Sequence, residues 1–187
     1  MQTGDQNNNW LNIRYNPANN WLGQTGASAD GFVQFETPLH SLRASDRTLK
    51  NYKTRHGINT VQDVVARWAP PSDKNPTENY INFVSQKTGY AADSPLDLDD
   101  PTVRENLIAA MMQFETPDVF SRYSSDMLQQ ARGLNADDDS KPVTSDPDTA
   151  ITLLKTSRKP PTSDPVAPSF GDLSNKDPSR ELTQEAF

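Results

Sequence analysis

The sequence predicts a mainly helical fold of the α+β class, with a short β segment near the N-terminus and an extended C-terminal arm. Apolar residues recur at helical spacing between residues 37 and 133, in segments separated by capping residues, glycines and prolines. All three tryptophans and all five tyrosines precede Gly133, whereas seven prolines follow it. We therefore expect a polar N-terminus over 1–9, one domain over 10–133 and a proline-rich arm over 134–187 that builds no core of its own.

The β segment is expected between residues 10 and 35. Residues 11–13 and 32–35 alternate apolar and polar side chains, which is typical of half-buried strands. The Asn-Pro pair at 16–17 and the glycines at 23 and 26 are turn signals between them. The sequence therefore predicts two short strands joined by turns.

The first two helices are marked by their ends. Pro38 suits the first position of a helix capped by Thr37, and Gly57 suits the end of that helix. The next helix is expected to begin at Thr60 and to end before the prolines at 70–71. Its inward face is expected to consist of Val61, Val64, Val65 and Trp68.

The third helix is expected to open at Asn75-Pro76, with Glu78 completing a capping box, and to stop near Gly89. The fourth is expected from Asp100-Pro101 to Glu115. Since this segment is the most apolar of the chain, the sequence places it at the centre of the domain.

A last helix is expected after Ser124, closed by Gly133. Within the arm, Asp146-Pro147 could start a short helix.

Composition excludes several kinds of site. Without cysteine there are no disulfides, thiolate zinc sites or cysteine nucleophiles, and the spacing of His40 and His56 does not suggest a metal site. No cofactor is expected. The aspartates at 137–139 lack the spacing of a calcium loop and are expected to be a solvated run.

Charge and hydropathy limit the kinds of partner that the chain is expected to bind. The net charge of −7 argues against coating nucleic acid or anionic membranes. No apolar run is long enough to span a bilayer, and the first ten residues do not read as a signal peptide.

Three stretches between residues 7 and 133 carry motifs of a known family. They are NNNWLNIRYNPANNWLGQTG from Asn7, GFVQFETPLHSLRA from Gly31 and YKTRHGINTVQDVVARWAPP from Tyr52. In the same order, they are similar to the motifs N-N-P-G-N-I-R, F-x-x-F-[DE]-[ST]-P, Y-x-x-x-x-G-x-N-T-V and W-A-P-P. Residues 7–133 thereby resemble a family of bacteriophage and prophage virion proteins. The resemblance implies a lysozyme-like domain in a structural protein of the particle, whether in capsid, tail or interior.

The chain departs from that pattern at two places. Trp10-Leu11 stands where the family has Pro-Gly before Asn12-Ile13-Arg14. Glu115-Thr116-Pro117 stands where the family reads Glu-Asn-Gly.

A lysozyme-like enzyme needs a general acid whose pKa is raised by an apolar environment. Glu115, at the end of the most apolar helix, is the catalytic candidate; the alternative is a solvated glutamate before a proline stop. Glu36, at a strand-to-helix junction, is a second candidate carboxylate, although stabilisation of the following helix N-terminus explains it as well.

Three aromatic residues are candidates for binding a sugar chain. Trp10, Tyr15 and Trp21 could stack on pyranose rings, or could pack in the core and turns of a small domain. For Arg14, pairing with a buried carboxylate is preferred to ligand contact.

The arm carries isolated apolar residues that suit insertion into pockets on other virion proteins. Ile151, Leu154, Phe170 and Phe187 are the expected anchors. Two functions stay open. The first is a structural virion component held by the arm. The second is a virion-associated peptidoglycan hydrolase, either a muramidase or a lytic transglycosylase, that aids genome entry after ejection.

Overall fold

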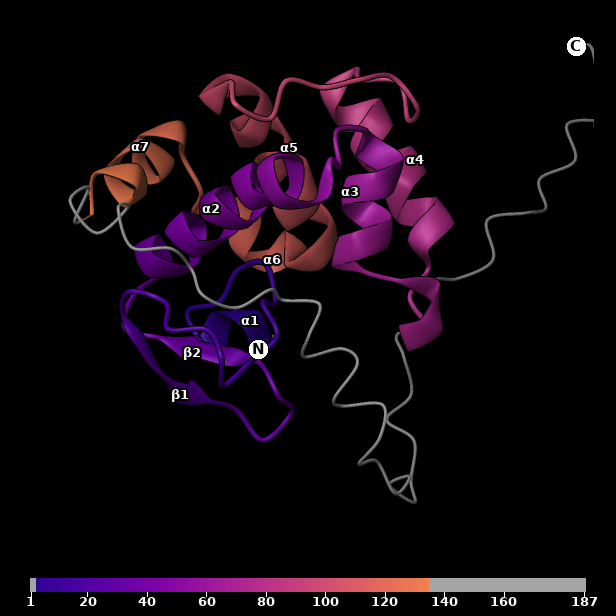
Figure 1. Cartoon of the computed structure of the whole chain (residues 1–187). Coiled ribbons are helices and arrows are strands. Elements are labelled where there is room, and N and C mark those ends of the chain that lie inside the picture. Colours follow the sequence, from indigo (N-terminus) through magenta and orange to yellow (C-terminus); the bar gives the residue numbers. More distant parts are fainter. Residues whose placement is uncertain (1–2, 135–187) are drawn as a thin grey trace, which may run out of the picture.

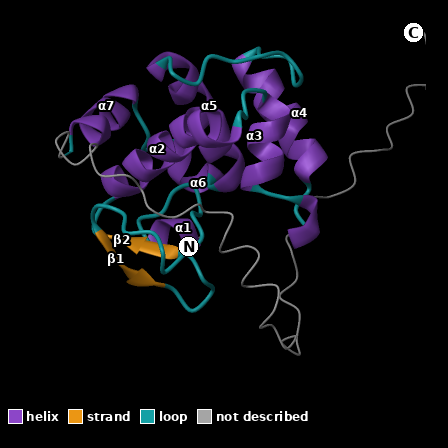
Figure 2. Ribbon diagram, viewed as in Figure 1, coloured by secondary structure: helices purple, strands orange, loops and turns teal. Residues whose placement is uncertain are grey.

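A computed structural model describes residues 3–134 of the chain. The helices are α1 (Thr3–Gln6), α2 (Pro38–His56), α3 (Val61–Trp68), the 3₁₀ turn η1 (Pro71–Asp73), α4 (Thr77–Thr88), α5 (Pro101–Glu115), α6 (Pro117–Phe120) and α7 (Ser125–Gly133). The strands β1 (Gln24–Ala27) and β2 (Val33–Phe35) form an antiparallel pair. Figure 2 shows this pair and α1 to one side of the helical body. The mainly helical α+β class predicted from the sequence is confirmed.

Helix α5 lies at the centre of the helical body, packed against α2, α4 and α6 (Figure 1). Its side chains Leu107, Ile108, Met111 and Met112 are fully buried. The central place that its apolar sequence predicted is therefore confirmed.

Most of the predicted helix ends are also confirmed. Gly57 and Gly89 close α2 and α4 in the left-handed conformation, which glycine adopts without a steric cost. The side chains of Asp100 and Ser124 accept hydrogen bonds from the first turns of α5 and α7.

The capping box predicted for α4 is wrong. This helix begins at Thr77, and Pro76, which has no N–H for a glutamate to bind, is its N-cap residue. The Asn75 side chain donates instead to the Pro70 carbonyl at 3.1 Å, and the Thr77 hydroxyl donates to the Ala69 carbonyl at 2.6 Å. Asn75, which was expected to cap the helix, thus holds the turn between α3 and α4 instead.

The predicted strand over 11–13 is wrong, and β1 forms at 24–27, where a turn was expected. The buried Asn9 side chain accounts for the first difference, because it binds both the N–H and the carbonyl of Ile13, at 2.8 and 2.9 Å. The Ile13 carbonyl also accepts a hydrogen bond from the Val33 N–H of β2 at 2.9 Å, and Arg14 and Phe32 form an isolated bridge. These contacts do not extend into a strand over 11–13.

A cluster of buried charges joins α2, α5 and α7. Asp46 of α2 accepts two hydrogen bonds from Arg104 of α5, at 3.0 and 3.2 Å, and two from Arg132 of α7, at 3.1 and 2.8 Å. Asp46 and Arg104 are each only 6% exposed. Arg132 also contacts Glu105, so two carboxylates face two guanidinium groups and the cluster carries no net charge.

We expect Gly23→Ala to lower the free energy of unfolding by about 1–2 kcal/mol or more, because Gly23 has a φ of +70° and the added Cβ would meet the His40 ring at 2.3 Å. Chemical denaturation measures the change. Gly57→Ala is the matched control, because Gly57 has a similar φ of +65° but nothing within 4 Å of the added carbon. Equal losses in the two variants would show that the ring moves aside freely.

We expect the domain to fold without residues 135–187. The core residues, the caps and the buried ion cluster all lie within the described residues 3–134. A chain ending at Leu134 should therefore keep one cooperative thermal transition, with a midpoint close to that of the full chain. A molten or insoluble fragment would contradict the predicted domain boundary.

Candidate functional site

Glu115, the catalytic candidate of the sequence, is the last residue of α5 and lies among apolar groups. The neighbouring Phe114 ring stacks on Tyr80 of α4, with ring centroids 4.0 Å apart and planes 13° from parallel. Tyr80 is only 1% exposed. The ring pair packs the end of α5 against α4 next to Glu115.

Two neutral groups from distant parts of the chain bind the Glu115 carboxylate. The Asn12 amide donates to Glu115 Oε2 at 3.1 Å. The Tyr80 hydroxyl faces the same carboxylate and also lies 3.4 Å from the Met111 carbonyl. Residues 12, 80 and 115 are therefore brought together only by the fold.

Burial raises the pKa of Glu115 above its usual range. Hydrogen bonds from Asn12 and Tyr80 and the charge of Arg14 act in the opposite direction, but burial is the larger effect. Burial also raises the pKa of Tyr80 well above its usual range, and the nearby Glu115 charge adds to the rise. Tyr80 thus stays protonated at neutral pH and can donate to the carboxylate.

The N-terminal segment is held against the end of α5 by Thr116. The Thr116 hydroxyl donates to the Trp10 carbonyl at 2.6 Å, and a Cβ on Gly4 would lie 2.8 Å from Thr116 Cγ2. The two places where the sequence departs from the resembling family, at Trp10-Leu11 and at Thr116-Pro117, are therefore in direct contact. From the sequence alone, these two departures from the family pattern had no visible connection.

Asn12 itself adopts the left-handed conformation, with a φ of +51°, which asparagine tolerates better than most residues. Asn9, fully buried, fixes the backbone on the C-terminal side of Asn12 through its bonds to Ile13, and its amide reaches the Val33 carbonyl of β2 at 2.9 Å. The asparagine-rich segment thus aims the Asn12 side chain at Glu115.

The three candidate sugar-binding aromatics do not meet in one place. Trp10 is 2% exposed and belongs to the main core, whereas Trp21, 7% exposed, belongs to a smaller core beside β2, against which the half-buried Tyr15 packs. Stacking on a sugar stays a prediction for these rings. The alternative, packing in the core and turns, accounts for the positions of both tryptophans.

Glu36 and Arg14 lie on the surface. Glu36 is exposed between β2 and α2 and is held through its backbone, whose carbonyl accepts from Asn8 at 3.1 Å. The Arg14 guanidinium lies 4.5 Å from the centre of the Phe32 ring and donates to the Asp30 carbonyl. The positive charge of Arg14 lowers the pKa of Glu115 through space. This is weaker than the direct pairing with a buried carboxylate that was expected for Arg14.

Two residues of the site were missed by sequence reasoning. Asn12 was given no role of its own in the site, although its place in the N-I-R motif was a usable signal. Tyr80 had been assigned to a helix without a role, and nothing in its local sequence connects it with Glu115. The expected anchors Ile151, Leu154, Phe170 and Phe187 lie outside the described residues.

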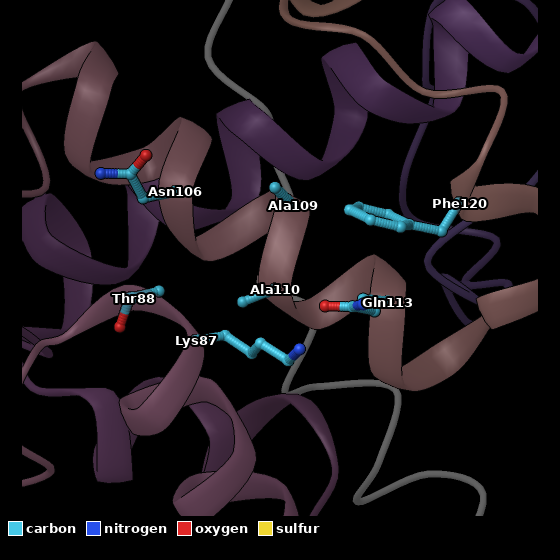
Figure 3. A pocket seen from close by; sticks show the side chains of 7 residues that line it. All are labelled: Lys87, Thr88, Asn106, Ala109, Ala110, Gln113 and Phe120. Atoms are coloured by element: carbon cyan, nitrogen blue, oxygen red, sulfur yellow. The ribbon is translucent and has the colours of Figure 1, made fainter.

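A hollow of about 260 Å³ lies between α4 and the opposite side of α5 (Figure 3). Its lining is Lys87, Thr88, Asn106, Ala109, Ala110, Gln113 and Phe120. Gln113 and Glu115 are two positions apart on α5, so their side chains leave the helix about 200° apart. The hollow and the Glu115 site are therefore separate.

Neither a metal-binding group of side chains nor a membrane-spanning helix is found within residues 3–134. No three histidine, cysteine, aspartate or glutamate side chains gather there in a way that could hold an ion. The helices of this part are also too short or too polar to cross a bilayer.

No protein-family model matches the chain. Protein P5 of Pseudoalteromonas phage PM2 is 40% identical to it over 116 residues. The aligned region covers 60% of this chain and 69% of the phage protein. The chain therefore belongs to the family of protein P5 of Pseudoalteromonas phage PM2.

Proposed function

We propose that the protein is a structural component of a bacteriophage virion, in which the domain over 10–133 has a lysozyme-like architecture and residues 134–187 anchor it to other virion proteins. Its relationship with a protein of phage PM2 supports the assignment to a phage. The position within the particle, in capsid, tail or interior, is left open by this proposal.

One observation favours a structural role over catalysis: the groups that a muramidase would use are engaged in packing. The Glu115 carboxylate is bound by Asn12, and the adjacent Thr116 holds the Trp10 carbonyl. Trp10 and Trp21 expose less than a tenth of their surface. The N-terminal segment thus covers the end of α5 instead of leaving it free for a sugar chain.

The test is incorporation into particles. Purified particles from cells that express the full chain should contain it, and particles from cells that express residues 1–134 alone should not. Residues 134–187 fused to an unrelated reporter should be incorporated as well, because the isolated apolar residues of the arm are the proposed anchors. Normal copy number of the arm-deleted protein would contradict this attachment, and absence of the full chain would contradict the virion assignment.

A second candidate function is cleavage of peptidoglycan, and a specific observation favours it. Burial raises the pKa of Glu115, and the direct hydrogen-bond donors to it, Asn12 and Tyr80, are neutral. A raised pKa favours the protonated form of the carboxyl group, which is the form that a general acid uses. Incubation of the full chain with purified peptidoglycan tests the idea. A hydrolase should release fragments with reducing ends, a transglycosylase anhydro ends, and a purely structural protein neither.

A further inference from the structure

Helix α1 packs against Asn12 and Thr116, the residues next to the Glu115 carboxyl group. Gly4 of α1 is buried, and a Cβ added to it would lie 2.8 Å from Thr116 Cγ2 and 3.0 Å from Asn12 Oδ1. The nitrogen of the same Asn12 amide donates to Glu115 Oε2 at 3.1 Å. The backbone of α1 therefore supports the amide that binds the candidate acid.

The chain that follows α1 is fixed to the end of β2. The Asn7 carbonyl accepts from the Phe35 N–H at 2.9 Å. The Asn8 amide donates to the carbonyls of Phe35 and Glu36, at 3.0 and 3.1 Å. Because this anchor begins at Asn7, α1 can move away from the end of α5 while the core residues that follow the anchor stay packed.

An ion pair joins α1 to the segment after α6. Asp5 of α1 pairs with Arg122, whose guanidinium group also lies 5.3 Å from the centre of the Trp10 ring. About half of the Arg122 side chain is exposed. Ion pairs as exposed as this one contribute little to stability and are weakened by salt. The contact can therefore open without unfolding of the domain.

We infer that α1 is a latch that controls access to the Glu115 carboxyl group. In the closed arrangement, which is the one in the structure, Gly4 supports Asn12, and Asn12 binds Glu115. In the open arrangement the pair of Asp5 and Arg122 is broken, α1 lies away from α5, and the Asn12 side chain can turn from the carboxyl group. The latch is an autoinhibitory contact if the chain cleaves peptidoglycan, and that role rests on the second candidate function. The opening itself does not.

Carbodiimide coupling of a small amine to the carboxyl groups of the full chain measures access to Glu115, with peptide mass spectrometry as the readout. Two carboxyl groups of the same chain are internal standards, since Glu36 is exposed and Asp46 is buried. In the wild type, Glu115 should react much more slowly than Glu36. Equal rates for these two residues would overturn the inference, because the carboxyl group would already be open.

Charge variants test the ion pair. Asp5→Lys and Arg122→Glu should each raise the Glu115 rate by about two- to fivefold, since exposed pairs of this kind are weak. The double variant restores the pair in reverse and should return toward the wild-type rate. The wild type at 1 M salt, where the Debye length falls to about 3 Å, should approach the single variants. Lys53→Glu is the matched control, because it breaks another exposed pair, with Asp97, and should leave the Glu115 rate unchanged.

Gly4→Ala opens the latch without a change of charge. Its Cβ would lie within 3.0 Å of Thr116, Asn9 and Asn12 atoms, so α1 has to move away from them. The Glu115 rate should therefore rise at low and at high salt alike. Gly133→Ala is the matched control, because nothing lies within 4 Å of its added carbon, and it should react as the wild type does.

An unchanged Glu115 rate in Gly4→Ala and in both charge variants would overturn the inference, whether or not the chain cleaves peptidoglycan. An equal rise at Asp46 would show a general loosening of the domain and would also overturn it. A rise confined to Glu115 supports the latch. Peptidoglycan cleavage by the same variants then tests the second candidate function separately. Faster cleavage would support autoinhibition, and raised access without any cleavage would contradict the hydrolase while supporting the latch.

Discussion

Asp46→Ala should lower the free energy of unfolding by about 3–5 kcal/mol, because it leaves the buried Arg104 guanidinium without a carboxylate. Asp46 is the common acceptor of Arg104 and Arg132, so the change removes four hydrogen bonds from three helices at once. Arg104 keeps its bonds to the carbonyls of Leu98 and Asp99, which do not neutralise its charge. Denaturant unfolding of the domain at neutral pH measures the loss.

The matched control for Asp46 is a surface ion pair of the same domain. Lys53 contacts Asp97 and Asp99, but these side chains are 34%, 65% and 55% exposed. Exposed pairs of this kind contribute about 0–1 kcal/mol, so Lys53→Ala should cost little. A small loss for Asp46→Ala, similar to that of Lys53→Ala, would show that water reaches the cluster and that it does not hold α7 on the domain.

A second variant separates charge from packing at the same place. The triple variant Asp46→Leu, Arg104→Met, Arg132→Met removes the three charges around Asp46 and keeps apolar volume, and it leaves only the partly exposed Glu105 of the cluster. Such exchanges are often neutral or stabilising when they pack well. We expect this triple variant to recover much of the stability that Asp46→Ala loses.

Glu115→Gln should abolish any peptidoglycan cleavage by the chain, with a loss of about 10²–10⁴-fold, since glutamine keeps the shape of the side chain but has no proton to transfer. The Asn12 amide can still donate to the remaining carbonyl oxygen, so the fold should be retained. Turbidity loss and released fragments from purified peptidoglycan measure the activity. Equal activity in both proteins would eliminate Glu115 as the acid, and no activity in either would favour the structural function.

The same variant has a second, activity-independent readout in the pH dependence of stability. Burial raises the pKa of Glu115 in the folded chain, so the folded state binds more protons than the unfolded state above the ordinary carboxyl value of about 4.3. The protonated carboxyl group of Glu115 therefore stabilises the wild type at low pH. This stabilisation is lost as the pH rises from the ordinary carboxyl pKa through the raised pKa of Glu115 in the folded chain. Glu115→Gln should lack this loss and should gain stability relative to the wild type as pH rises. Parallel pH profiles of the two proteins would contradict the burial effect.

Local signals along the chain were sufficient for most ends of the five longer helices, α2, α3, α4, α5 and α7. Gly57, Gly89, Asp100 and Ser124 act within one helical turn of their own position, so their effect can be read without knowing the fold. The apolar spacing of α5 likewise predicted its central place.

The β segment could not be predicted in the same way. A strand depends on what pairs with it, and at Ile13 the Asn9 side chain binds the N–H and shares the carbonyl with the Val33 N–H of β2. Residues 24–27, rich in small and polar side chains, become β1 because β2 lies beside them.

The candidate site shows the same difference between features that are local in the sequence and features that depend on the fold. The sequence by itself determined the mainly helical class, the ends of most helices and Glu115 as the carboxyl group at the end of the most apolar helix. Only the tertiary structure decided that Asn12 and Tyr80 bind this carboxylate, that Thr116 holds Trp10, and that Asp46 lies between two arginines. Helix caps and helical periodicity are interactions between residues a few positions apart. The pKa of Glu115 and the charge balance around Asp46 depend on burial and on groups 35 to 103 residues away, which come together only when the chain folds.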